Sequence, residues 1–392
     1  MDLHEIKRNM GGKILQFSIP AIISMLLSAF ITVADGFFMG NYVGEEGIAA
    51  VNLGLPIVYL YLGVGLMISI GGVAISGMAL GSGDRACCKQ VFCQTIATTT
   101  VVSLAISVVM WICFRPMLTL LKAEGEVNRY FREYYSIMLL EFPVMVVNSA
   151  FGMFIRGEGH PEFFMKVTVL SVLLNVGFDY VFAGILAFGA SGIAWASFVS
   201  ALASLAWILY YFWKRAEVYR LGTFSFSLPL CIQAILNGSS EFIGEMSTGI
   251  AMFAYNFVIM RRVGAEGVAA FTIVGYVAYV FSMVIVGFGQ GASPLISFCY
   301  GAGEEELAKN IQKRTVRYVF GAGAAVFFIM MLISDWYGGI FVRSGQVKAM
   351  IRSGMAIFMI SFKFIQKHLG DGSNQLGFSR KMHHSIIFQT SS

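Results

Sequence analysis

The stretch from Ile31 to Ala50 reads I-T-V-A-D-G-F-F-M-G-N-Y-V-G-E-E-G-I-A-A, and it predicts the organisation of the whole chain. Its first half is apolar except for Asp35, and an acid inside a membrane span is so costly that a functional role is its default interpretation. Its last eight residues, from Val43, return as V-G-A-E-G-V-A-A from Val263, with six identical positions. The stretch therefore contains a candidate site and one copy of an internal repeat.

The composition is that of an integral membrane protein. Of 392 residues, 57% are hydrophobic and 12% are charged, against roughly 25% charged in soluble domains. The net charge of +5 mainly reflects loop residues that set membrane topology, so no nucleic-acid partner is expected. No nucleophile with its base, metal cluster or phosphate loop appears, which predicts a protein that is not an enzyme and has no cofactor.

Apolar runs long enough to cross a bilayer, about 20 residues each, follow one another along the chain. Nine runs meet or approach this length: Ile14–Met39, Val51–Leu80, Val91–Phe114, Tyr134–Ile155, Phe163–Phe188, Ile193–Trp213, Leu230–Met260, Val268–Tyr300 and Val316–Ser334. A tenth begins near Met350 and loses its apolar character after Phe362.

The repeat continues beyond these eight residues. Gly81 and Gly83 recur at the same spacing as Gly301 and Gly303. Six predicted helices separate equivalent points, and an even number means that both halves enter the membrane from the same side. We therefore predict an all-α integral membrane fold of two parallel-repeat six-helix lobes. Twelve transmembrane helices are expected, of which about ten are present and the last is incomplete.

The predicted domains follow from the repeat. They are an N-terminal six-helix lobe (1–213), a cytoplasmic linker (214–229), an incomplete C-terminal lobe (230–362) and an aberrant polar tail (363–392). The charges of the tail cannot be satisfied in hydrocarbon, so we expect a chain truncated at its C-terminus by a frameshift or early stop. Fourteen Lys and Arg residues fall on the side of the N-terminus and eight on the other, which favours a cytoplasmic N-terminus.

Five acids lie within the predicted spans: Asp35, Glu141, Asp179, Glu241 and Glu245. Such acids usually face a bundle interior or a water-filled cavity. This interpretation is favoured for Asp35 and Asp179. Glu241 and Glu245 are equally compatible with this interpretation and with a position near a helix end, where the side chain reaches the interface. Glu141, beside Pro143, is better explained by local backbone contacts.

Asn175 and Asp179 are four residues apart, so they lie on one face of a helix. A carboxylate and an amide oxygen suit Na⁺, and a desolvated carboxyl group equally suits proton exchange; the sequence leaves both open. Ser197, on the next predicted helix, either adds a hydroxyl or packs as a small residue. Pro20 removes a helical hydrogen bond upstream of Asp35 and makes either a static kink or a hinge.

Three motifs together resemble the multidrug and toxic compound extrusion (MATE) family of bacterial transporters. They are A-D-G-F-F-M-G-N-Y-V-G-E-E-G-I-A-A (Ala34–Ala50), R-G-E-G-H-P (Arg156–Pro161), expected as a tight turn, and L-N-V-G-F-D-Y-V-F (Leu174–Phe182). The resemblance implies a twelve-helix antiporter that exchanges Na⁺ or H⁺ for amphipathic cationic drugs across the bacterial inner membrane.

The resemblance also implies roles for particular residues. Asp35, Asn175 and Asp179 would form the cation-linked site of the first lobe, where Na⁺ is one possible occupant, and Pro20 would lie at a bend. Glu241 or Glu245 would be the carboxylate of the second lobe. The expected partners are small organic cations and membrane lipid, and the expected state is a monomer.

Two alternatives remain beside drug export. A lipid-linked sugar flippase of the same superfamily would need a strongly cationic cavity, whereas the charges within the predicted spans are acidic. A non-functional truncated membrane remnant is the other alternative, because the predicted second lobe is incomplete.

Overall fold

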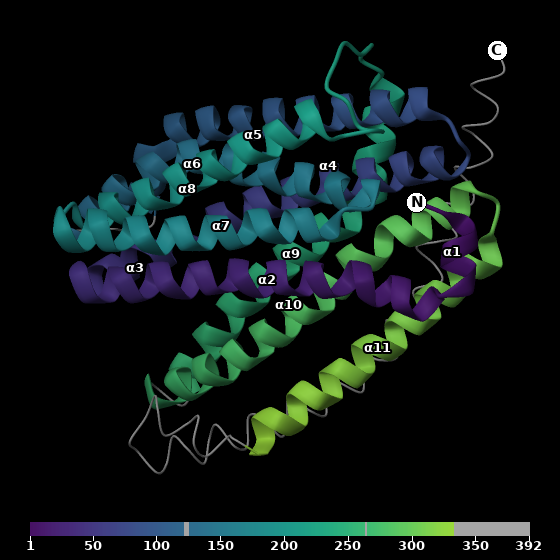
Figure 1. Ribbon diagram of the computed structural model, residues 1–392. Helices are drawn as coiled ribbons and strands as arrows, with labels where there is room; N and C mark the ends of the chain where they lie inside the picture. The colour runs from purple at the N-terminus through teal and green to yellow at the C-terminus, as the bar shows by residue number, and fades with distance from the viewer. Residues whose placement is uncertain (121–124, 263–264, 333–392) are drawn as a thin grey trace. The chain divides into compact units, whose positions relative to one another are not determined.

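A computed structural model describes residues 1–120, 125–262 and 265–332, and within these ranges it contains helices and no β-strand. In chain order (Figure 1) the elements are α1 (Leu3–Arg8), α2 (Met10–Tyr42), α3 (Glu45–Leu53), α4 (Leu55–Gly81), α5 (Arg85–Leu120), α6 (Gly125–Glu158), α7 (Pro161–Asp179), the π-helical turn η1 (Tyr180–Ile185), α8 (Gly189–Lys214), α9 (Leu228–Arg262), α10 (Ala265–Gly301) and α11 (Glu305–Leu332). The predicted all-α fold is confirmed.

Each of the nine predicted spans overlaps a described helix along most of its length. The span predicted from Val51 needs one correction, because α3 ends at Leu53 and α4 begins at Leu55. Pro56 in the first turn of α4 explains the new start, since proline is favoured where its missing N–H has no helical partner. The tenth predicted span and the polar tail lie outside the described residues.

Seven helices in the described part of the chain are long and apolar enough to cross a membrane. They cover Met10–Tyr42, Glu46–Gly81, Arg85–Phe114, Gly125–Glu158, Pro161–Ile185, Gly189–Lys214 and Tyr279–Gly301. A helix needs about 20 apolar residues for this purpose, so length and composition agree with the predicted multi-pass membrane protein.

Helix α6 is the centre of the first half. It is buried along most of its length and packs against α4, α5 and α8, while α2 pairs with α7 (Figure 1). Aromatic side chains fill the contacts: the rings of Phe92 and Phe212 stack 4.9 Å apart, and those of Phe131 and Tyr135 lie 4.5 Å apart. Such pairs add about 0.5–1.5 kcal/mol each beyond area burial.

The repeat is visible in the backbone as two equivalent turns. Gly83 follows α4 with φ 82°, and Gly303 follows α10 with φ 78°. In each turn the next residue donates its N–H to the carbonyl five positions earlier, at 2.9 Å. A φ in this range is rarely adopted by residues with a side chain, which explains why both copies of the repeat have glycine here.

The repeated helices α4 and α10 also meet each other through equivalent residues. A Cβ atom at Gly81 would overlap the carbonyl oxygen of Phe298, and a Cβ atom at Gly301 would overlap that of Met78. Met78 and Phe298 are themselves repeat equivalents, so the same contact occurs twice. A two-fold axis between the copies requires this reciprocity, which agrees with the predicted parallel repeat.

The chain forms two compact units. Met1–Ala251 with Val286–Ala308 make the first, which contains α1 to α8, most of α9 and the end of α10. Met252–Ile285 with Lys309–Ser392 make the second, whose described part is the rest of α9 and α10 together with α11. Every contact discussed below lies within the first unit. The domain boundaries derived from the repeat stay a prediction.

Candidate ion-coupling site

Three helices bring four sequence-predicted polar side chains together. Asp35 comes from α2, Asn175 and Asp179 from α7, and Ser197 from α8, and these helices pack against one another. Asn175 is 1% exposed and Asp179 is 0% exposed, with Ser197 also buried. The i, i+4 spacing in α7 thus places both of its polar residues in the interior, next to the acid of α2.

A short hydrogen-bond chain joins these residues. The Asn175 amide Nδ2 donates to Ser197 Oγ at 3.1 Å, and Ser197 Oγ donates to Asp35 Oδ2 at 3.3 Å. The carboxyl groups of Asp35 and Asp179 interact electrostatically. A proton on one of them would remove the repulsion between two carboxylates.

Several buried oxygen atoms of this cluster have no hydrogen-bond donor. They are Asp35 Oδ1, Asn175 Oδ1 and both side-chain oxygens of Asp179. An unpaired buried carboxylate is costly, and either a shared proton or a hard cation, which prefers oxygen ligands, would remove that cost. Within the described residues no group of three or more His, Cys, Asp or Glu could hold a metal ion. The cluster itself offers the side-chain oxygens of two acids, an amide and a hydroxyl.

Helix α7 changes its geometry directly after Asp179. The π-helical turn η1 begins at Tyr180 and runs to Ile185. Single π-helical turns are rare and often occur at functional sites. The sequence predicted one continuous span here, so it identified the acid but not the change of helix type that follows it.

Helix α6 places two further residues near this cluster. Glu141 is 6% exposed, its Oε2 has no donor, and its charge interacts with that of Asp35. Tyr134, two turns earlier, is buried and interacts electrostatically with both Asp35 and Asp179. The seven-residue spacing on one helix face was the available signal for this pair.

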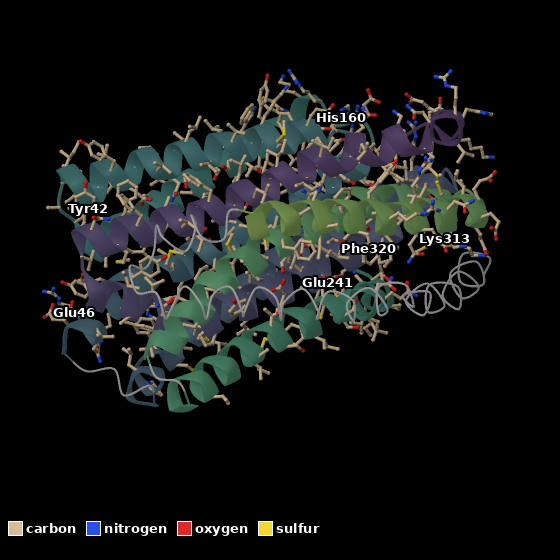
Figure 2. All side chains as sticks on the ribbon, turned by 90° about the horizontal axis from the view of Figure 1, so that it is seen from below. Tyr42, Glu46, His160, Glu241, Lys313 and Phe320 are labelled. Atoms are coloured by element: carbon tan, nitrogen blue, oxygen red, sulfur yellow. The ribbon has the colours of Figure 1, made fainter. Side chains whose placement is uncertain are left out.

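Glu241 and Glu245 lie on α9 and belong to a different neighbourhood. Both are half-buried and their charges interact with each other. Glu245 interacts with Tyr59 of α4, and its Cβ lies 3.6 Å from the position that a Cβ of Gly63 would occupy. Glu245 therefore faces α4, whereas the cluster around Asp35 is formed by α2, α7 and α8. Figure 2 labels Glu241.

Helix α2 continues through Pro20 without a break from Met10 to Tyr42. The carbonyl of Pro20 accepts a hydrogen bond from Ser24 Oγ at 2.9 Å. This is one way in which a serine supports helical backbone around a proline within a membrane span. The role of Pro20 as a hinge stays a prediction.

The segment R-G-E-G-H-P was expected as a turn, and this was wrong for its first three residues. Helix α6 continues to Glu158, only Gly159 and His160 form the turn, and α7 begins at Pro161. Gly159 has φ 106°, a conformation that suits glycine. The helix extends to Glu158, whose buried carboxylate is satisfied by hydrogen bonds from the segment after α8.

Glu158 attaches the segment after α8 to the end of α6. Its Oε2 accepts from the Tyr211 hydroxyl at 2.8 Å, and its Oε1 accepts the backbone N–H groups of Glu217 and Val218 at 2.8 and 2.6 Å. Next in the chain, Tyr219 is buried and its hydroxyl accepts from Ser76 Oγ at 3.0 Å. Burial raises the pKa of Tyr219, so this phenol stays protonated. The predicted linker is thus fixed to the helices at this point.

These features define a class: a multi-pass helical membrane protein with an internal parallel repeat and a buried polar cluster suited to a proton or a small cation. The particular family follows from comparison with known proteins. The MatE family model matches residues 20–181 and 242–367, which is most of the chain. The chain belongs to the MatE family.

Its curated relatives are distant in sequence. The chain is 23% identical over 349 residues to the multidrug export protein MepA of Staphylococcus saprophyticus subsp. saprophyticus, which covers 88% of this chain and 76% of that protein. The MepA protein of Staphylococcus aureus strain MSSA476 is 22% identical over 335 residues, with 81% and 70% covered.

Solved structures show the same arrangement of helices. One is the outward-facing conformation of a multidrug resistance MATE family transporter of the MOP superfamily, with a TM-score of 0.82 and 24% identity. Another is a MOP superfamily transporter from Pyrococcus furiosus whose binding pocket is described as having reverse polarity, with a TM-score of 0.81 and 24% identity. In both cases 88% of this chain and 77% of the other are covered.

Proposed function

We propose that this protein is an antiporter that exports amphipathic organic cations in exchange for Na⁺ or H⁺. Family membership supports a transport function, and the curated relatives are named multidrug export proteins. The observation that carries the proposal is the pair of half-buried Asp35 and buried Asp179, whose buried unpaired oxygens can take up and release a proton or a cation.

The location of this pair gives a means of coupling. Because its side chains come from α2, α7 and α8, filling or emptying the site changes the contacts among three helices. A ligand shifts a conformational equilibrium only if it binds one state better than the other. We propose that the ion and the drug favour opposite states, so that uptake of one promotes release of the other.

The charge of the drug would be met by acids elsewhere in the first unit. Glu241 and Glu245 lie four residues apart on α9, both are half-buried, and Glu245 faces α4. Two carboxylates on one helix face attract an organic cation and repel an anionic lipid-linked sugar. This favours drug export over a flippase, and we assign the protein no enzymatic reaction.

We propose that the N-terminus is cytoplasmic. Figure 2 labels the exposed residue Glu46 at one end of the first unit and His160 toward the other. A membrane-impermeant maleimide should label Glu46→Cys in intact cells and His160→Cys only after permeabilisation. The reverse pattern would contradict the proposed topology.

The full chain in proteoliposomes provides the test of function. Ethidium efflux is followed after a jump in Na⁺ or in pH, for the unchanged protein and for Asp35→Asn. We expect efflux after one of the two jumps and none in the variant, with Glu126→Gln, an exposed acid paired with Arg129, as the matched control. Ion-driven efflux that persists in Asp35→Asn would contradict the proposal.

A further inference from the structure

Arg156 is a buried cation without an acidic partner. It lies in the last turn of α6, is 1% exposed, and its guanidinium stands over the ring of Phe164, 5.0 Å from the ring centre. Its Nη2 donates to the side-chain oxygen of Gln290 on α10 at 2.8 Å. Its Nε and Nη1 are buried and have no acceptor.

This arrangement is unusual for arginine. A buried guanidinium is normally paired with a carboxylate and uses most of its five N–H donors. In the described part of the chain no carboxylate forms an ion pair with Arg156, and Glu158, two residues further on, is used by Tyr211 and backbone N–H groups. One hydrogen bond to a neutral amide therefore ties this charge to α10.

The acceptor lies where α10 makes its tightest approach to α2. Gln290 stands between Gly287 and Gly291, and a Cβ atom on either glycine would come within about 2.5 Å of the backbone of Ile22 or Ser18. Helices in such contact cannot slide or tilt without separating. If α10 moves away from α2 at this level, the hydrogen bond from Arg156 must break at the same time.

The first half of the repeat has no counterpart of this hydrogen bond. The position equivalent to Gln290 in the first half is Ile70, which cannot accept a hydrogen bond. The equivalents of Gly291 and Ser18 are Gly71 and Gly238, which lie on the corresponding helices: a Cβ atom at Gly71 would overlap the backbone of Ala234 on α9, and one at Gly238 would overlap that of Met67 on α4. The Arg156–Gln290 hydrogen bond is therefore not a requirement of the repeated backbone.

We propose that the Arg156–Gln290 hydrogen bond is a releasable latch that favours the state in which α10 is closed against α2 and α6. The neutral acceptor is central to the idea, because a carboxylate at the same position would make a charge-assisted bond about twice as strong. A latch of that strength would hold the closed state too firmly for a transport cycle. The inference rests on the proposed function, since it needs a protein that alternates between two states.

Two substitutions of Gln290 change the latch in opposite directions and leave Arg156 in place. Gln290→Glu supplies the missing carboxylate, so the ratio of closed to open molecules should rise at least fivefold. Gln290→Leu removes the acceptor, so the ratio should fall by a similar factor. The control is Gln90→Glu, which adds a carboxylate on α5, where Gln90 makes only an exposed 3.4 Å bond to the carbonyl of Ser225.

Distances between spin labels at His160→Cys and Glu306→Cys report the two states. Both positions are exposed: His160 directly precedes α7, and Glu306 lies in the first turn of α11, which follows α10. The cysteines that are not buried, Cys87, Cys113 and Cys231, are first replaced. We expect the closed population to decrease in the order Gln290→Glu, unchanged protein, Gln290→Leu, with Gln90→Glu equal to the unchanged protein. Ethidium efflux should be lower in Gln290→Glu than in the control.

The outcomes separate the latch from the proposed function. If the unchanged protein shifts its distances with substrate or ion but the Gln290 variants coincide with it, the latch is wrong and the antiporter proposal stands. If the unchanged protein shows one distance under all conditions, both are overturned. A purely structural role for Arg156 would alter thermal stability in both variants without this opposite ordering of populations.

Discussion

The turns around Gly83 and Gly303 share one backbone, with φ values of 82° and 78° and equivalent hydrogen bonds. The cluster around Asp35 differs, because the equivalent of that acid in the second half is Tyr255. Duplication therefore preserved the positions where the backbone itself requires glycine. It did not preserve the acid, so we expect the proposed coupling chemistry mainly in the first half.

The largest predicted effect on ion-driven efflux compares the cluster around Asp35 with the equivalent position in the second half. Asp179→Asn removes one of the two carboxyl groups that would meet the ion, and an interaction with a charged group contributes about 1.5–3 kcal/mol, roughly 10- to 100-fold in ion binding. Tyr255→Phe, at the repeat equivalent of Asp35, should change ion-driven efflux less than about twofold. Equal losses in both variants would show that the second half shares the coupling chemistry.

Substitutions at the two glycines where α4 and α10 cross should cause similar losses of thermal stability. Gly81→Leu and Gly301→Leu each push a side chain into a facing carbonyl, and such overpacking costs about 1–3 kcal/mol or more. Thermal unfolding in detergent measures the loss. Gly289→Leu, on the same helix with nothing within 4 Å, is the control. A large loss for only one of the two glycines would break the two-fold relation.

A smaller effect is expected within the cluster itself. Ser197→Ala removes the hydroxyl that accepts from Asn175 and donates to Asp35. One hydrogen bond contributes about 0.5–1.5 kcal/mol, so the affinity for the coupling ion should fall by roughly two- to tenfold. Ion titration of efflux rates measures this. An unchanged affinity would assign Ser197 to packing, the other interpretation that the sequence allows.

The duplicated turns are tested by stability alone. Gly83→Ala and Gly303→Ala place a side chain where φ is positive but nothing lies within 4 Å, so only the backbone cost of about 1–2 kcal/mol remains. Both variants should lose similar thermal stability. Gly36→Ala, in the middle of α2 with open space around it, should not lose stability. Unequal losses at the two turns would mean that their surroundings, not their shared backbone, decide stability.

The fold was predictable because membrane spans depend on local properties. An apolar run of sufficient length is a helix wherever it occurs, and a repeat at a fixed offset is visible in the sequence without any contact. The acids of the candidate site were found in the same way, since Asp35 and Asp179 are conspicuous among apolar neighbours. Their joining through Ser197 required the structure.

The contacts at the end of α6 could not be predicted. Arg156 and Gln290 are 134 positions apart, and Glu158 binds backbone N–H groups about 60 positions later. Backbone groups are present at every residue, so the sequence cannot identify which of them an acid will bind. Both residues were assigned to a loop because glycine and proline lie beside them.

The central claim is that ion and drug compete through Asp35, and ligand binding to the purified protein tests it most directly. Binding of tetraphenylphosphonium, an amphipathic cation, is measured while Na⁺ or H⁺ is varied, for the unchanged protein and for Asp35→Asn. Linkage is reciprocal, so the apparent affinity of the unchanged protein should fall as the coupling ion rises, and the variant should show no dependence. The same dependence in Asp35→Asn would contradict the account.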